Sequence, residues 1–207
     1  MPDTNSQYDL EFNRYTFVYL LNELLQDRIE NLRMLFPNQD KSFAEAIARN
    51  EFNRRKSLKL QFLSSVVNIE DQDSLFDVFG SFKAYPLGPV DEVIFEEMKA
   101  DDLPLFNINQ NGLRIKEGEA IEGVEEFLNE KDKTIIGRIK KAVEALKKLN
   151  KGLINYSAGE LVEITHKWRA WRDAMYYTDN DTSTDYVVMS EDTIREEYRA
   201  IGLYYYI

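Results

Sequence analysis

The chain has 207 residues, of which 43% are hydrophobic and 13% aromatic, and this composition predicts a globular protein with a single domain over residues 1–207. Asp and Glu outnumber Lys and Arg by 37 to 26, and the resulting net charge of −11 disfavours nucleic acid and anionic membranes as partners. The absence of cysteine excludes disulfides, zinc–thiolate sites and thiol catalysis.

The N-terminal segment is acidic at its start and has an apolar run only from Phe17 to Leu21. We therefore expect neither a signal peptide nor a membrane span, and a cytoplasmic protein. Apolar residues then recur at intervals of three to five residues from Leu10 onward, which predicts an amphipathic helix that ends before Pro37.

Two further helices are expected from Phe43 to about Arg55 and from Ser57 to Val67, the latter more apolar and therefore central in the fold. Glycines and prolines make the next stretch irregular. Helical spacing returns from Val90 to Lys99, and Pro89 stands where it could be the first-turn proline of that helix.

The segment around Asn111-Gly112 has a different pattern, because its apolar residues roughly alternate from Phe106 to Ile115. Asn-Gly favours the positive backbone angles of a two-residue turn. We therefore predict one small β-hairpin near residues 105–116, and no other β element.

Helices dominate the remainder of the predicted fold. The clearest runs from Lys131 to Lys151, and Ser157 with Glu160 forms a capping box for a helix that reaches about Met175. Residues 176–207 are expected to form a loop, a helix from about Ser190 to Ala200 and a tyrosine-rich tail, Tyr204 to Tyr206. The predicted class is α+β, predominantly α-helical.

His166 is the only histidine, and Glu163 precedes it by three residues, the spacing of ligand pairs in carboxylate-bridged metal bundles. Such a site needs a second pair, which a chain with one histidine lacks. On a continuous helix His166 also lies opposite the face of Leu161, Trp168 and Trp171. We therefore predict no metal and no cofactor, and interpret His166 as a structural or interface residue.

Other signals for catalysis are weak. Carboxylates four residues apart, such as Glu92 and Glu96, are expected by chance in an acidic chain and are interpreted as solvated helix faces. Neither a nucleophile elbow nor a glycine-rich phosphate loop is present, so we predict no catalytic residues. The lysines between Lys131 and Lys151 are interpreted as a solvated face with ion pairs to the acidic segment from Asp91 to Glu130.

Two stretches, about seventy residues apart, together resemble a known family: "YPLGPVDEVIFEEMK" from Tyr85 and "SAGELVEITHKWRAWRDA" from Ser157. They are similar to the Panacea domain, the SocA-like antitoxin family that is also found in phage-associated proteins. The resemblance spans about residues 15–175. Its matching residues are Gly88, Pro89, Val90, Leu161, Thr165, His166, Trp171 and Ala174.

The resemblance implies a mostly helical antitoxin that binds a cognate toxin, encoded by an adjacent gene, and neutralises it by direct contact. It implies no catalytic residues. Gly88-Pro89 would form a rigid turn at the start of a helix, and His166 and Trp171 would brace the domain. The acidic surface suits a basic partner.

Two other functions stay open. The protein could be a phage or mobile-element accessory protein that acts as a protease adaptor or a transcriptional regulator, and a metal-dependent enzyme is the least favoured reading. The sequence leaves the toxin, its contact surface and the oligomeric state undefined.

Overall fold

Helices dominate the structure, a computed structural model that describes residues 9–180 and 185–201. The longest helix, α1 (Leu10–Leu35), begins at Asp9, whose carboxylate accepts a hydrogen bond from the Phe12 amide. It is followed by α2 (Lys41–Glu51), α3 (Arg54–Val66), α4 (Phe76–Phe79), α5 (Glu92–Ala100), α6 (Ile121–Lys131), α7 (Ile135–Leu149), α8 (Ala158–His166), α9 (Arg169–Asn180) and α10 (Glu191–Ile201). The predicted class, predominantly helical α+β, is confirmed. Among the described residues, no helix is both long and apolar enough to cross a membrane.

The predicted hairpin is present as two antiparallel strands, β3 (Phe106–Asn109) and β4 (Gly112–Ile115). Asn109 pairs with Gly112, which leaves a two-residue turn, and Gly112 has a φ of 138° that favours glycine. The Asn-Gly signal therefore located the hairpin, but the expected turn is displaced by one residue: Gln110 and Asn111 form the turn, and Gly112 is the first residue of β4.

A second antiparallel hairpin, β1 (Phe82–Tyr85) and β2 (Gly88–Asp91), was not predicted. Pro89 lies in β2, so the expectation that it occupies the first turn of a helix is wrong. The helix, α5, begins instead after Asp91, whose carboxylate accepts a hydrogen bond from the Ile94 amide. Gly88-Pro89 thus follows a hairpin turn and does not start a helix.

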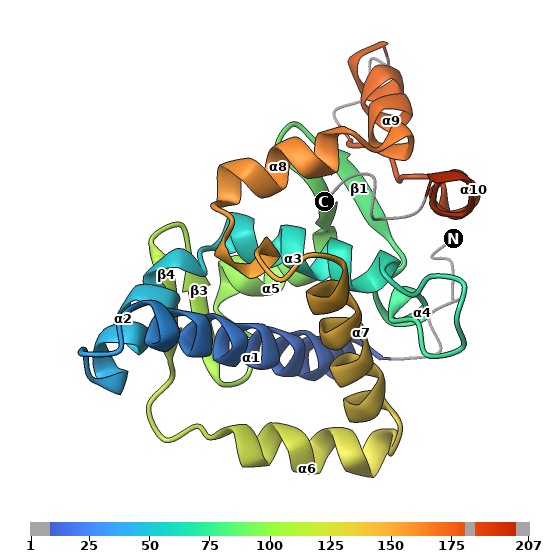
Figure 1. Cartoon of the computed structure of the whole chain (residues 1–207). Coiled ribbons are helices and arrows are strands. Elements are labelled where there is room, and N and C mark those ends of the chain that lie inside the picture. The colour runs from blue at the N-terminus through green and yellow to red at the C-terminus, as the bar shows by residue number, and fades with distance from the viewer. Residues whose placement is uncertain (1–8, 181–184, 202–207) are drawn as a thin grey trace.

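Helix α3 lies at the centre of the molecule, as its apolar sequence indicated. Every residue from Lys56 to Val66 is buried, including two lysines, Lys56 and Lys59. In Figure 1, α6, α1, α3 and α8 follow one another from the bottom of the molecule to the top. The buried apolar side chains form one connected cluster that extends from Phe12 to Ile194.

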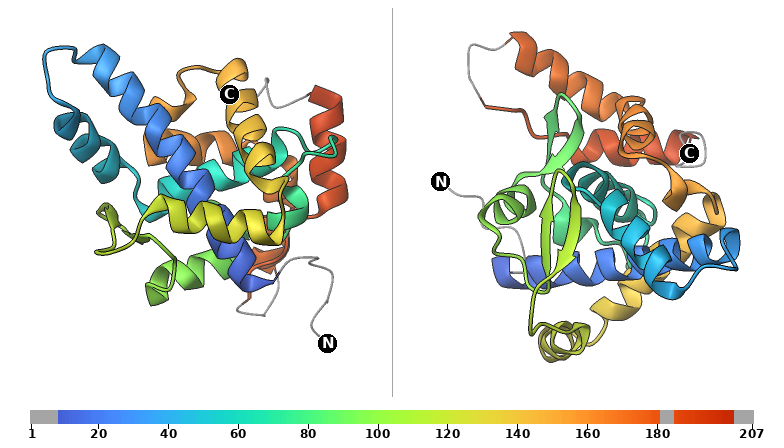
Figure 2. Two further views of the ribbon diagram at one scale, coloured as in Figure 1. Left: turned by 90° about the horizontal axis from the view of Figure 1, so that it is seen from below. Right: turned by 90° about the vertical axis from the view of Figure 1, so that its left-hand side faces the viewer.

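Helices α8, α9 and α10 are grouped around the β1–β2 hairpin, at the opposite end of the molecule from α6 (Figures 1 and 2). The capping box is confirmed: the side chains of Ser157 and Glu160 each accept a hydrogen bond from the backbone amide of the other residue. The helix predicted to reach Met175, however, is interrupted at Lys167 and Trp168. The continuous helix that placed His166 opposite Trp171 is therefore wrong.

The interruption has a tertiary cause. Trp168 is fully buried and meets Phe62 of α3 edge to face, with ring centroids 5.4 Å apart. Beyond it, the first amides of α9, those of Arg169 and Ala170, donate to the Glu197 carboxylate at 2.6 and 3.2 Å. A carboxylate on α10 thus supplies the N-terminal cap of α9, and local sequence around Trp168 does not contain that signal.

Within residues 176–207, the described segment after α9 packs against β1 and contributes to the core. Val187 and Met189 run beside β1, where Ala84 donates to the Val187 carbonyl and Met189 donates to the Phe82 carbonyl. Met189 and Ile194 are buried. The tyrosine-rich tail, Tyr204 to Tyr206, lies outside the described residues.

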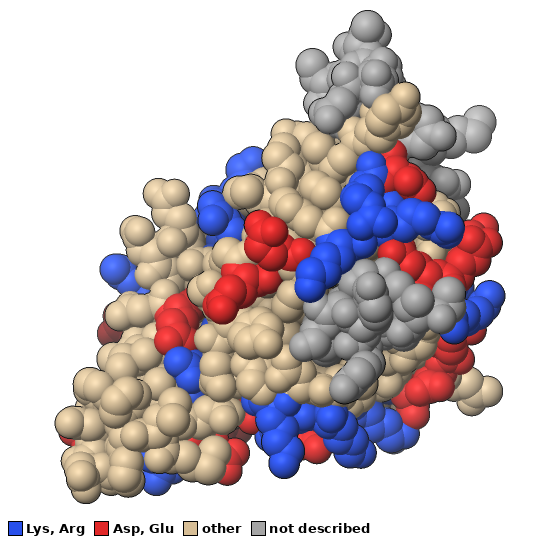
Figure 3. Space-filling model, turned by 45° about the horizontal axis from the view of Figure 1, so that its top comes forward, with Lys and Arg blue, Asp and Glu red and all other residues tan. Residues whose placement is uncertain are grey.

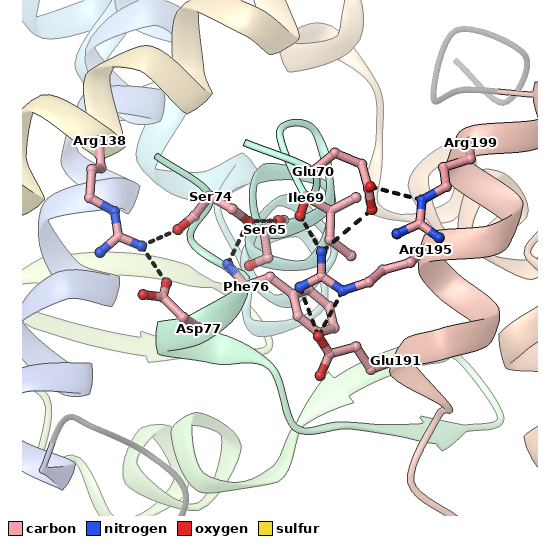
Figure 4. A network of polar contacts seen from close by, with 10 residues as sticks. All are labelled: Ser65, Ile69, Glu70, Ser74, Phe76, Asp77, Arg138, Glu191, Arg195 and Arg199. Carbon is pink, nitrogen blue, oxygen red and sulfur yellow. Dashed lines mark hydrogen bonds and ion pairs between the residues drawn. The ribbon is translucent and has the colours of Figure 1, made fainter. Parts of the chain in front are cut away.

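Polar contacts attach α10 to the segment that follows α3. The Arg195 guanidinium donates to the Ile69 carbonyl, and Glu70 pairs with both Arg195 and Arg199 (Figure 4). In the same segment, Arg138 of α7 donates to the Ser74 carbonyl and pairs with Asp77. The segment between α3 and α4 is therefore held from two sides, by α7 and by α10.

Candidate binding site

The turn between β1 and β2 is the point where the two motif segments meet. Tyr85 pairs with Gly88, which leaves Pro86 and Leu87 as the turn residues. Gly88 has a φ of 92°, and a Cβ at this position would collide with the Thr165 hydroxyl oxygen and lie 2.8 Å from Cε of Lys59. Only glycine combines this backbone angle with such a close approach of α8 and α3.

Residues of α8 and α9 hold this turn. The Trp171 indole N–H donates to the Tyr85 carbonyl at 2.9 Å. The His166 ring lies close enough to the Pro86 backbone for that backbone to raise the ring's pKa. His166 and Trp171 also stack on each other, with centroids 3.9 Å apart and an interplanar angle of 13°. Thr165, His166 and Trp171 therefore form a brace around the turn.

The other motif residues are buried. Pro89 and Val90 belong to β2, and the Pro89 carbonyl accepts a hydrogen bond from the Lys59 ammonium at 2.6 Å. Leu161 of α8 and Ala174 of α9 are part of the apolar core. The turn thus joins Gly88, Thr165, His166 and Trp171, whereas Leu161 and Ala174 pack in the core.

The His166 ring is half-buried, and desolvation is the main cause that lowers its pKa below the ordinary value. The Lys59 charge lowers the pKa further, while the Glu163 charge and the Pro86 backbone raise it. Its Nε2 has no hydrogen-bond partner. The lowered pKa favours the neutral imidazole at neutral pH.

The described residues contain no group of three or more His, Asp or Glu side chains placed to hold a metal ion. The close carboxylates have other partners: Glu92 pairs with Lys83 and accepts from the Tyr85 hydroxyl, and Glu96 pairs with Lys99. The Glu92 and Glu96 carboxylates therefore bind different lysines and do not form a pair directed at one point.

The lysines of α7 pair with different acids from those expected. Lys141 pairs with Asp73 in the segment before α4, and Lys147 pairs with Asp27 of α1. These acids precede the acidic segment from Asp91 to Glu130 in the sequence, so the expectation of pairs with that segment is wrong for both lysines. On the face shown in Figure 3, basic and acidic side chains lie in small groups, several of which touch a group of the opposite charge.

A pocket of about 410 Å³ opens beside the braced turn. Its apolar wall is formed by Leu58, Tyr85, Pro86, Leu87, Val90 and Phe95. The first turns of α3 contribute three cationic side chains, Arg54, Arg55 and Lys59, and the β3–β4 turn contributes Gln110. Both hairpin turns therefore face the N-terminal end of the central helix.

Lys59 is the most unusual charged residue of this pocket. Its side chain is 1% exposed, and burial, followed by the charge of Arg55, lowers its pKa to about 7. Sequence reasoning did not single it out. The available signal was its position inside the most apolar helix, where a lysine is rarely placed without a specific partner.

Comparisons with protein-family models, with curated proteins and with solved structures found no match to this chain. The resemblance to the Panacea domain stays a prediction based on the two motif segments.

Proposed function

We propose that this protein is an antitoxin-like binding protein that neutralises a cognate toxin, encoded by an adjacent gene, through direct protein–protein contact. The observation that carries the proposal is the convergence of the two motif segments on one turn. Residues that match a family pattern are expected to share a structural role, and Gly88, Thr165, His166 and Trp171 share one contact set.

The turn itself is a suitable contact element. Leu87 at its tip is 48% exposed, although both adjoining strands are fixed by buried side chains. A rigid apolar tip costs little conformational entropy when a partner covers it. The net charge of −11 adds a long-range attraction for a basic toxin.

Co-expression with the neighbouring open reading frame tests the proposal. The neighbour alone should arrest growth, and co-expression should restore growth and yield a complex that co-purifies and weakens as salt concentration rises. A neighbour that is harmless alone, or stays toxic in co-expression, would overturn the proposal. If co-expression restores growth because the toxin protein is degraded, and growth is not restored in protease-deficient cells, the protein is a protease adaptor instead.

The contact surface is tested by a matched pair of exposed apolar residues. Leu87→Asp at the turn should abolish neutralisation, whereas Val93→Asp on α5, where the native side chain is equally exposed at 48%, should retain it. Circular dichroism checks that both variants fold. Equal neutralisation by the two variants would place the toxin contact away from the turn.

A further inference from the structure

The pocket beside the braced turn has cationic side chains that do not pair with any acidic side chain the structure describes. No ion pair joins Arg54, Arg55 or Lys59 to a carboxylate of the described side chains, those of residues 9–176 and 185–199. Lys56, three residues before Lys59 on the same helix, provides the contrast, because its ammonium lies 3.6 Å from the Glu51 carboxylate. Among the described side chains, Arg54, Arg55 and Lys59 are therefore three cations gathered at one pocket without an acidic partner.

The contacts that these cations do make are with neutral groups. Lys59 donates to the Pro89 carbonyl, and Arg54 donates to the Met98 and Ile108 carbonyls while its guanidinium lies over the Phe95 ring. The Nε atom of Arg54 is buried without a hydrogen-bond partner. Arg55 is exposed at the mouth and contributes to the potential at Lys59.

The direction of α3 adds to the positive potential. Residues Asn53 to Lys59 are the first two turns of a 13-residue helix, whose N-terminal end carries a partial positive charge. The Asn53 side chain caps this end by accepting a hydrogen bond from the Lys56 amide. The positive potential of the helix end and the charges of the cationic side chains therefore add in the pocket.

The remaining lining is apolar and partly aromatic. Tyr85 and Phe95 contact each other edge to face, with centroids 6.0 Å apart, and Leu58 and Val90 close the interior. A volume of about 410 Å³ is at the lower end of the range for small-molecule sites. Apolar walls with a few charged groups at one side select a ligand that has both parts.

We propose that this pocket binds a small carboxylic acid whose apolar or aromatic body packs against Tyr85, Leu87 and Phe95 and whose carboxylate faces Arg55 and Lys59. A monoanion suits the site better than a phosphate dianion, because the cost of desolvation rises steeply with charge and most of the wall is apolar. The ligand site adjoins the toxin contact proposed above and shares Leu87 with it, but the probe titrations below and the co-expression experiment test the two proposals separately.

A pair of isosteric probes tests the charge requirement. 3-Phenylpropionate and 3-phenylpropionamide have the same body, and only the first carries a carboxylate. In titrations followed by ¹H–¹⁵N correlation spectra, the acid should shift the amide signals of Leu58, Leu87 and Phe95 and should bind at least about tenfold more tightly than the amide. Equal affinity of the two probes, or no shifts with millimolar acid, would overturn the proposal.

Variants assign the recognition to particular cations. Arg55→Gln and Lys59→Met should each weaken binding of 3-phenylpropionate by about tenfold and leave binding of the amide within about twofold. Lys148→Gln, at an exposed lysine of α7, is the matched control and should change neither. If Arg55→Gln binds the acid as tightly as the native protein, the ligand carboxylate does not contact Arg55. Because Arg55 is exposed, this substitution is not expected to disturb folding, so a loss of binding would report on the contact itself.

Phenyl phosphate distinguishes the anion class. It should bind more weakly than 3-phenylpropionate to the native protein. If phenyl phosphate binds more tightly than 3-phenylpropionate and Arg55→Gln abolishes that binding, the pocket recognises a phosphate instead of a carboxylate, and the proposal is overturned.

Discussion

Gly88 is restricted in two independent ways. Its φ of 92° is strained for any residue with a Cβ, and the space that a Cβ would need is taken by Thr165 and Lys59. The two restrictions have different origins, one in the local turn and one in the packing of α8 and α3. A relaxed backbone alone would not make room for a larger residue.

Replacement of this glycine should therefore destabilise the protein. We expect Gly88→Ala to lower the free energy of unfolding by about 2–4 kcal/mol, measured by urea denaturation. Gly123→Ala on α6, where a Cβ would meet no atom within 4 Å, is the control and should stabilise the protein by about 0.5 kcal/mol. A Gly88→Ala variant as stable as the native protein would show that the turn relaxes without cost.

The burial of Lys59 affects stability as a function of pH. Burial lowers its pKa to about 7 in the folded protein, whereas an unfolded chain has the ordinary value of 10.5. Between these values the unfolded state binds more protons, so the free energy of unfolding rises with pH. The destabilisation is fully present below pH 7 and is lost as the pH rises toward 10.5.

The native protein should consequently become more stable from pH 7 to 9, with a contribution from Lys59 of up to about 1.4 kcal/mol per pH unit. Lys56, whose pKa burial lowers to about 8, adds a smaller rise in the same direction. Lys59→Met should remove the larger contribution, and Lys148→Met, at an exposed position, should retain it. Urea denaturation at pH 7, 8 and 9 measures the slopes, and identical slopes for the two variants would contradict the assignment.

At the scale of elements, the junction of α8 and α9 depends on a distant carboxylate. Glu197 of α10 is buried and accepts hydrogen bonds from two N-terminal amides of α9. The neighbouring Glu196 is exposed and pairs only at the surface with Arg169. Adjacent glutamates on one helix thus have different energetic roles.

Glu197→Gln should lower the free energy of unfolding by about 1–2 kcal/mol, because the charge at the N-terminus of α9 and one acceptor are lost. Glu196→Gln should change it by less than about 0.5 kcal/mol, as expected for an exposed ion pair. Thermal denaturation of both variants measures the difference. Equal midpoints would mean that Glu197 does not act as the cap.

The elements that could be predicted from sequence are those whose signals are local. The helical spacing of α1, α3 and α7, the Ser157–Glu160 capping box and the Asn111-Gly112 signal for the β3–β4 hairpin all depend on residues a few positions apart. The β1–β2 hairpin and the break at Trp168 depend on partners far along the chain, namely Thr165 for Gly88 and Glu197 for α9. No pattern within the segment itself encodes such partners.

The candidate site follows the same division. The motif residues Gly88, Thr165, His166 and Trp171 could be named from the sequence, although their common contact with one turn could not. The pocket was missed because its cations come from α3 and its walls come from both hairpins. Only the folded chain brings these segments together.

At the scale of the whole molecule, the segment after α9 completes the core. Met189 is 2% exposed, whereas Val188, its neighbour, is 50% exposed. Met189→Ala should lower the free energy of unfolding by about 2–4 kcal/mol, and Val188→Ala should change it by less than about 0.5 kcal/mol. Urea denaturation compares the two, and a small effect of Met189→Ala would show that this segment is dispensable for the core.

The position of that segment also sets the order of events during synthesis. Phe62, Phe76 and Phe82 form an aromatic group that Trp168 helps to cover, and the segment that pairs with β1 beside this group includes Met189. Roughly 100 residues separate Phe82 from Met189. At a translation rate of about 5–20 residues per second, the aromatic group is synthesised roughly 5–20 s before the segment that completes its packing. A nascent chain that pauses in this interval presents aromatic surface to chaperones and to other chains.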